Sequence, residues 1–266
     1  MRSGELDDLR AQRTSLKLRW TLTSVLAAAR RLLSPLAPAL LALSLLASTS
    51  GLAEPLTRVF LNGRPSPVYF NDGDSFTVKG GPLSGTKARL AGFNTLESFG
   101  PAHRWGDWQA SELYVIAKMG ALNARRGEWH CQSDMQRDGY GRILWLCPDL
   151  IEDDIRKGLA HAMSITAEPA PARQLELQKL AQAERRGMWA KGVPKFVLTS
   201  LHSADEGAGK DTYNRLISTE DGHTEKWLHQ DNYAECAEVC HPSGACMVYI
   251  AFNRRYGPNR AECLKH

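Results

Sequence analysis

Four short segments, in a fixed order, carry the residue types that cleavage of a phosphodiester requires. They are residues 71–75 (Asn-Asp-Gly-Asp-Ser), 89–97 (Arg-Leu-Ala-Gly-Phe-Asn-Thr-Leu-Glu), 137–142 (Arg-Asp-Gly-Tyr-Gly-Arg) and 186–189 (Arg-Gly-Met-Trp). Such cleavage needs positive charge beside the phosphate oxygens, an activated water, and a cation or acid near the leaving oxygen. Acidic groups, a further Glu and two arginines together predict metal-assisted hydrolysis of a nucleic-acid backbone.

Each of these residues also has a structural interpretation. Asp72 and Asp74 offer oxygen ligands suited to a hard cation such as Ca²⁺, although Asp-Gly-Asp is also a common turn. Arg89 lies in an apolar strand, where it could bind a phosphate or form an ion pair with Glu97. Glu97 could activate water or be a solvated loop charge. Arg142 could reach a transition-state charge or lie exposed in a hairpin.

Two tyrosines are candidates for contact with bases. Tyr114 and Tyr140 could each stack on a nucleic-acid base or simply pack against the protein.

The surrounding pattern alternates between strands and helices. Alternation and turn residues predict strands at 68–70, 75–78, 87–93, 128–131 and 142–147, whereas 3.6-residue periodicity predicts helices at 110–124, 150–163 and 172–190. About five strands closed by three helices, with polar residues in the turns, predict an α+β domain over residues 54–198 built on a small β-barrel.

In combination, these segments resemble the thermonuclease (staphylococcal nuclease-like) family over about residues 66–192. The resemblance rests on residues 72–75, 89–97, 138–142, 158–160 (Gly-Leu-Ala) and 187–189. It implies a five-stranded OB-fold barrel with three packed helices, and Ca²⁺-dependent attack of water on DNA or RNA that leaves 3′-phosphates.

The same resemblance implies roles for individual residues. Asp74 and the carbonyl of Thr95 would bind Ca²⁺, with Asp72 supporting the site from behind. Arg89 and Arg142 would bind the phosphate, and Glu97 would be the general base.

The chain departs from the family at two positions of one motif. The family reads Asp-Thr-Pro-Glu, whereas this chain reads Asn-Thr-Leu-Glu at residues 94–97. Asn94 still offers a carbonyl oxygen to the metal but removes one negative charge, so the affinity for Ca²⁺ should fall. Leu96 replaces the proline and is expected to loosen the turn that holds Glu97. The alternative function is therefore an inactive OB-fold module that binds nucleic acid or a protein partner.

The first 53 residues have the features of an export signal. An apolar run at 32–47 follows Arg30 and Arg31, and the small residues Gly51 and Ala53 fit cleavage before Glu54. An uncleaved signal anchor is the alternative. The leader holds seven Lys/Arg and three acidic residues, so the remainder carries 26 of each and no net charge. We expect an exported, periplasmic or secreted monomer without a lasting membrane segment; net charge alone gives no support for nucleic-acid binding.

Six cysteines follow the leader. An even number in an exported chain predicts disulfides, and Cys131 and Cys147 flank a hairpin across which they could pair. The other four, Cys236, Cys240, Cys246 and Cys263, allow three pairings, and a zinc site is the rival interpretation. We expect a polar linker at 199–232 and a cysteine-rich module at 233–266. Its arginines 254, 255 and 260 lie near aromatic residues and could grip a nucleic-acid backbone or face solvent.

Overall fold

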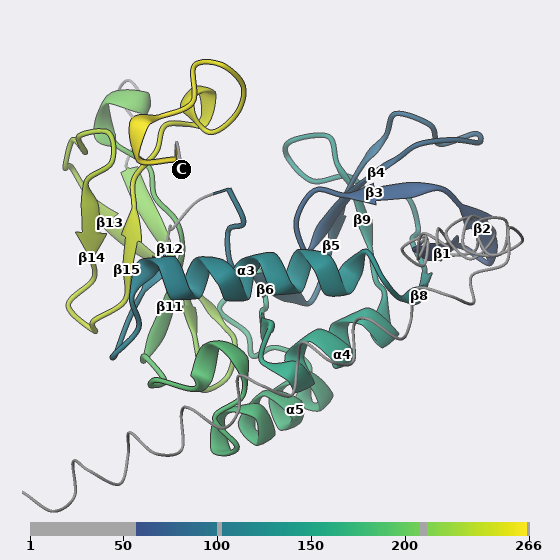
Figure 1. Cartoon of the computed structure of the whole chain (residues 1–266), viewed down its shortest axis with the longest axis horizontal. Helices are drawn as coiled ribbons and strands as arrows, with labels where there is room; N and C mark the ends of the chain where they lie inside the picture. The colour runs from purple at the N-terminus through teal and green to yellow at the C-terminus, as the bar shows by residue number, and fades with distance from the viewer. Residues whose placement is uncertain (1–56, 100–102, 208–211, 265–266) are drawn as a thin grey trace, which may run out of the picture. The chain divides into compact units, whose positions relative to one another are not determined.

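The computed structural model describes residues 57–99, 103–207 and 212–264, and these form a mixed α+β protein (Figure 1). The helices in this part of the chain are α3 (Ala110–Ala124), α4 (Pro148–Lys157) and α5 (Ala172–Ala183). The strands are β1 (Arg58–Leu61), β2 (Arg64–Ser66), β3 (Val68–Phe70), β4 (Ser75–Val78), β5 (Lys87–Leu90), β6 (Phe93–Thr95), β7 (His103–Arg104), β8 (Glu128–Cys131), β9 (Ile143–Trp145), β10 (Ala160–Ala162), β11 (Phe196–Ser200), β12 (Thr212–Ser218), β13 (Thr224–His229), β14 (Glu238–Cys240) and β15 (Cys246–Val248). The expected leader lies outside the described residues.

The sheet that carries the first candidate residues has the order β3-β4-β5-β9. Strands β3, β4 and β5 form an antiparallel meander, and β9 runs parallel to β5. Apolar residues alternate along these strands, so one face is buried. It contributes Phe70, Phe76, Leu90 and Ile143 to a core that α4 and α5 also line. The two helices lie side by side in Figure 1.

Several predicted elements end earlier than expected. The helix predicted at 172–190 ends at Ala183, and the strand predicted at 142–147 covers only Ile143–Trp145. Two other elements end early at a glycine. The strand expected at 87–93 is interrupted because Gly92 has a φ of +91°, and the chain resumes as β6. The helix expected at 150–163 ends at Lys157, where Gly158 adopts the left-handed conformation that favours a helix C-cap. The following residues then form β10, which pairs antiparallel with β6 and places His161 opposite Asn94.

The expected closed barrel is not confirmed. Within the described residues, the strands form five separate sheets, ordered β2-β1-β8, β10-β6, β11-β12-β13, β14-β15-β7 and β3-β4-β5-β9, and none of them closes on itself. The α+β class and the three helices are as predicted.

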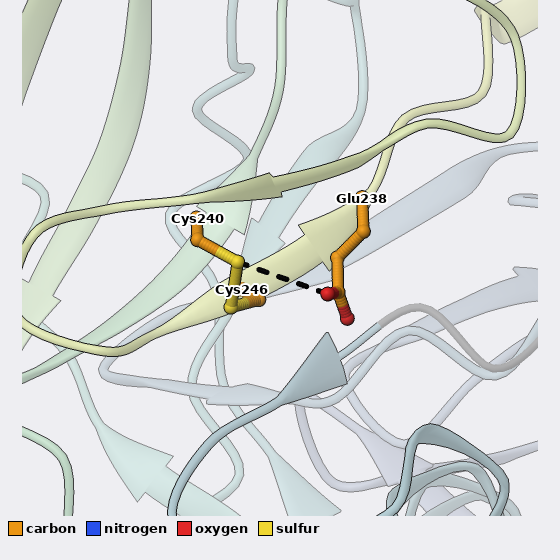
Figure 2. Close-up of side chains that lie close together, drawn as sticks. All are labelled: Glu238, Cys240 and Cys246. Carbon is orange, nitrogen blue, oxygen red and sulfur yellow. Dashed lines mark hydrogen bonds between the residues drawn. A yellow bond between two sulfur atoms is a disulfide. The ribbon is translucent and has the colours of Figure 1, made fainter.

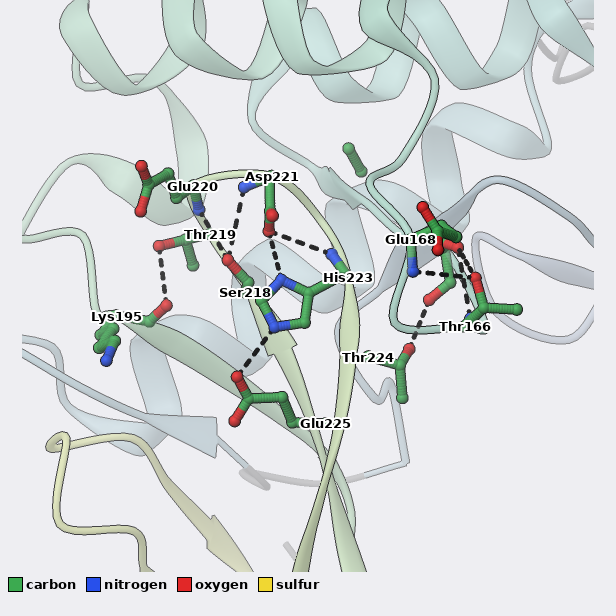
Figure 3. Close-up of polar contacts among 12 residues, drawn as sticks. Thr166, Glu168, Lys195, Ser218, Thr219, Glu220, Asp221, His223, Thr224 and Glu225 are labelled. Atoms are coloured by element: carbon green, nitrogen blue, oxygen red, sulfur yellow. Dashed lines mark hydrogen bonds and ion pairs between the residues drawn. The ribbon is translucent and has the colours of Figure 1, made fainter.

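Residues 199–232, expected as a linker, instead contain most of a sheet. Strands β12 and β13 form a hairpin, and β12 pairs with β11. The turn of the hairpin docks on the segment after β10, because the Ser164 amide donates to the Gly222 carbonyl over 2.7 Å. Figure 3 shows His223 in this turn between Asp221 and Glu225, with N–O distances of 2.5 and 2.8 Å. Sequence periodicity missed these strands because polar side chains interrupt their alternation.

The cysteines form three disulfides. Cys131 pairs with Cys147, as predicted from the hairpin, and the C-terminal four pair as Cys236–Cys263 and Cys240–Cys246. In the C-terminal region, β15 pairs antiparallel with β7 as well as with β14. The cysteine-rich segment is therefore attached to the strand that follows the Glu97 loop. Among the described helices, none combines the length and apolar character needed to cross a bilayer.

Candidate active site

Asp74, Arg89 and Asn94 form a buried polar network where β4, β5 and β6 meet. An ion pair joins Arg89 Nη1 to Asp74 Oδ1, and Arg89 Nη2 donates to Asn94 Oδ1 over 2.6 Å. The second carboxylate oxygen of Asp74 accepts the Thr95 backbone N–H at 3.0 Å. Backbone pairing fixes these positions, because Ser75 lies opposite Arg89 and the Leu90 amide donates to the Asp74 carbonyl. The sequence segments 72–75 and 89–97 therefore do come together.

Glycine at position 73 lets the Asp72–Asp74 turn approach Thr95 closely. A Cβ atom at Gly73 would lie 2.4 Å from Thr95 Cγ2, a distance that real side chains do not adopt. The glycine thus sets the spacing between the acidic turn and the strand that carries Asn94 and Thr95.

The Asn94 side chain uses both its donor and its acceptor atoms. Its Nδ2 donates to the Thr95 carbonyl over 2.8 Å and lies 3.3 Å from Nε2 of His161, while its Oδ1 accepts from Arg89. Burial lowers the pKa of His161 to about 4, so this ring is neutral and can accept the amide proton. A carboxylate at position 94 would lose both donated bonds.

Glu97 lies in a well-anchored turn. Leu96 is fully buried and packs in a cluster with Trp105, Met188 and Trp189. The Glu97 amide also donates to His103 Nε2 over 3.1 Å. Burial of the Leu96 side chain and the bond to His103 are therefore the contacts that hold this turn, in which no proline restricts the backbone.

The acidic side chains at the site repel one another. Burial, followed by the charge of Asp74, raises the pKa of Glu97 to about 7. Burial and the charges of Asp74 and Glu97 raise the pKa of Asp72 well above its ordinary value, although Ser75 donates to its Oδ1 over 2.7 Å. Opposing cations lower the pKa of Glu97, in the order Arg255, Arg89 and Arg142.

Asp138 orients Arg142. The aspartate accepts from Arg142 Nε over 2.7 Å and from its backbone N–H over 3.0 Å, which closes the hairpin turn. Within the described part of the chain, Nε is the only side-chain atom of Arg142 that donates a hydrogen bond to protein, so its two terminal amino groups remain for a ligand. The charge of Arg142 also lowers the pKa of Glu97, less than Arg255 and Arg89 do, so the 137–142 turn lies within electrostatic range of this acid.

The two candidate tyrosines are placed differently. Tyr140 is 81% exposed, and the Arg142 guanidinium carbon lies 5.5 Å from its ring centroid. Its ring is therefore accessible for stacking, and it lies beside a guanidinium group. Tyr114 lies on α3 and is half-buried, and its described cation–π partner is Lys118 on the same helix. No described contact connects Tyr114 with the acidic residues.

The last sequence segment supports the site without entering it. Gly158 and Gly187 meet backbone to backbone, because the Met188 amide donates to the Gly158 carbonyl over 2.9 Å and neither position has room for a Cβ. Met188 and Trp189 then fill the cluster that buries Leu96.

Several residues at the site were not found from the sequence. His161 is an isolated polar residue that reaches Asn94 from a distant strand, and His103 accepts the Glu97 amide from six residues along the chain. Asp138 lies in the sequence segment 137–142, but its local bonds to Arg142 were not predicted. Arg255 belongs to the C-terminal module, and the sequence offered only its clustering with aromatic residues as a signal.

The site has the charge pattern of a cation site. The mutual repulsion of Asp72, Asp74 and Glu97 is the interaction that a divalent cation would relieve. Oxygens of Asp74 and Asn94 already converge on one cationic group, the Arg89 guanidinium. The residues present therefore fit Ca²⁺ if Arg89 releases these oxygens.

A second cluster of potential ligands is not a metal site. Glu238, Cys240 and Cys246 lie close together, but Figure 2 shows their two sulfur atoms bonded to each other. Arg104 also holds the Glu238 carboxylate with bonds of 2.7 and 2.6 Å. The zinc interpretation of the C-terminal cysteines is thus replaced by disulfides.

Comparison with known proteins adds no assignment. No protein-family model matches this chain. No curated protein matches it either.

Proposed function

We propose that this protein is an exported phosphodiesterase that hydrolyses DNA or RNA by metal-assisted attack of water. The observation that supports it most is the polar network that holds Arg89 against Asp74 and Asn94, together with Glu97, whose pKa is raised to about 7 and is influenced by the charges of Arg89 and Arg142. A general base works best when its pKa lies near the working pH.

The chemistry assigned to these residues is a single displacement. Glu97 takes a proton from water, the water oxygen bonds to phosphorus, and the bond to the leaving oxygen breaks as that oxygen takes a proton from solvent; Glu97 then returns its proton to solvent. Arg142, oriented by Asp138, and Arg89 stabilise the negative charge that develops on the phosphate oxygens. Arg142 is held by Asp138 before the substrate arrives, whereas Arg89 must first release Asp74 and Asn94.

Ca²⁺ is the proposed cofactor. Asp74, Asn94 Oδ1 and the Thr95 carbonyl would hold it. Asp72 would support these ligands without binding the metal directly. When bound, the cation would supply charge neutralisation at the phosphate and would lower the pKa of a water molecule. Its affinity is expected to be modest, since Asn94 contributes no charge.

An OB-fold barrel is part of the same proposal. The order β3-β4-β5-β9 extends towards β8 through a bridge between Gln132 and Leu146, the residues that directly follow β8 and β9. At the far ends of this array, β2 and β3 are separated only by Pro67. A small closed barrel is consistent with this strand order.

Export is proposed from the leader features at residues 1–53 together with the three disulfides, which are typical of oxidising compartments. The second candidate function, a binding module without turnover, is favoured by the absence of a carboxylate at Asn94.

The deciding experiment is cleavage of single-stranded DNA and RNA by the disulfide-bonded protein, with Ca²⁺ or with chelator. Glu97→Gln and Arg142→Ala should each lower the rate by about 10²-fold or more. Arg64→Ala, at an exposed arginine of β2, is the matched control. Unchanged rates in both site variants would refute the proposal, whereas binding without cleavage under Ca²⁺, Mg²⁺ and Mn²⁺ would favour the module.

A further inference from the structure

The C-terminal module places a cation and two aromatic rings beside the Glu97 loop. Phe99 is two residues after Glu97, and its ring centroid lies 5.2 Å from the guanidinium carbon of Arg255 and 6.3 Å from the ring of Tyr256. The same guanidinium carbon lies 5.9 Å from the ring of Phe252. Arg255 thus contacts one ring from the Glu97 loop and one from its own module.

Several contacts hold this segment in place. Arg255 Nε donates to the Ile250 carbonyl over 3.1 Å, and the Cys236–Cys263 disulfide closes the segment that contains it. Ile250, Ala261 and Leu264 form a small core against which Phe99 packs. The strand pairing of β15 with β7 attaches the module to the residues that follow the Glu97 loop. The module therefore presents Arg255 from a cross-linked platform.

Arg255 differs from the neighbouring Arg254 in its pairing, and the rings of Phe252 and Tyr256 are exposed. Arg254 is held by Glu235 with bonds of 2.7 and 3.1 Å, so its charge is already neutralised locally. Phe252 and Tyr256 are 76% and 64% exposed. Proteins bind single-stranded nucleic acid with exposed aromatic rings near an arginine, through base stacking and phosphate contact.

We propose that Arg255, Phe252 and Tyr256 form an additional subsite for single-stranded nucleic acid, in which Arg255 binds a phosphate next to the one cleaved and the rings stack on bases. The inference rests on the proposed function for the identity of the ligand. It gives the cysteine-rich module a role in substrate binding. The proposed catalytic chemistry at Asp74, Arg89 and Asn94 does not depend on that role.

The test is equilibrium binding in a Glu97→Gln background, with a fluorescent single-stranded DNA of about 12 nucleotides. Arg255→Ala should weaken binding and make the slope of log K against log salt shallower by about 0.7, the value for one lost phosphate contact. Arg255→Lys should keep the slope. Phe252→Leu and Tyr256→Leu should weaken binding without changing the slope of log K against log salt. Arg260→Ala, an exposed arginine of the same module, is the matched control and should change neither quantity.

The outcomes separate this inference from the catalytic proposal. If Arg142→Ala weakens binding while Arg255→Ala changes neither affinity nor slope, the subsite is refuted and the catalytic site stands. If Arg255→Ala weakens binding as described but Glu97→Gln leaves cleavage unchanged, the subsite stands and the catalytic role of Glu97 is wrong. An equal loss of affinity in Arg255→Ala and Arg260→Ala would refute the subsite, because the loss would then reflect the lower positive charge of the module and not a specific contact of Arg255. A protein that binds no oligonucleotide would refute both.

Discussion

Replacing Glu97 with glutamine should make the protein more stable and less active. The pKa of Glu97 rises from an ordinary value of 4.5 to about 7, mainly because the carboxylate is buried and then because Asp74 is near. The folded state therefore holds the proton more tightly than the unfolded state. The resulting stability is fully present below pH 4.5 and is lost as the pH rises through 7.

A shift of this size corresponds to a cost on the order of 3 kcal/mol for keeping Glu97 ionised in the folded protein at pH 8. Glutamine has nearly the same shape and does not ionise. Glu97→Gln should thus raise the free energy of unfolding at pH 8 by up to that amount and leave it nearly unchanged at pH 4. Loss of the proposed general base should lower the cleavage rate by about 10²- to 10⁴-fold.

Urea unfolding at pH 4 and pH 8, in the presence of chelator, measures the stability difference, and cleavage of single-stranded DNA with Ca²⁺ measures the activity. Glu168→Gln, at an exposed glutamate, is the control and should change both by little. A Glu97→Gln variant that is less stable than the original protein at pH 8 would refute the reasoning. It would mean that Glu97 is a structural ion-pair partner of the nearby arginines.

Three further predictions concern the surroundings of the site. Asn94→Asp should raise the affinity for Ca²⁺ several-fold in isothermal titration, because it adds a charge and frees the Thr95 carbonyl; an unchanged affinity would place the metal elsewhere. Hydrogen bonds to Glu225 and Asp221 raise the pKa of His223, so their stabilisation is complete below pH 6.5 and is lost as the pH rises above that value. His223→Ala should therefore lower the melting temperature more at pH 6 than at pH 9, and an equal loss at both values would contradict this. Gly73→Ala should cost about 1–3 kcal/mol in urea unfolding because its Cβ meets Thr95, whereas Gly139→Ala, with open space around it, should cost much less.

The elements that sequence predicted best are short and bounded by local signals. Strands β3, β4 and β8 and helix α3 have the predicted bounds, since alternating or 3.6-residue patterns lie between turn residues there. Local patterns predicted the ends of elements less well where a single glycine changes the direction of the backbone. Gly92 and Gly158 each adopt positive φ, and neither angle follows from composition.

The contacts that sequence could not predict are those between distant elements. The hairpin spacing pointed to Cys131–Cys147, but the spacing of the other four cysteines did not distinguish among three pairings. In the same way, His161 reaches Asn94 only because β10 returns to pair with β6. Placement of Arg255 depends on β15 pairing with β7, which joins residues more than a hundred positions apart.

Glu97 is the residue that best separates an enzyme from a module that only binds. A nucleic-acid-binding surface needs cations and aromatic rings, and here Arg142, Arg255 and Tyr140 could supply them without any acid. A buried carboxylate in that place costs stability when ionised and repels phosphate. Turnover, by contrast, needs a group that accepts a proton near pH 7, and burial beside Asp74 gives Glu97 that property. The proposed catalytic role therefore gives a reason for the energetic cost of this carboxylate that a purely binding role does not give.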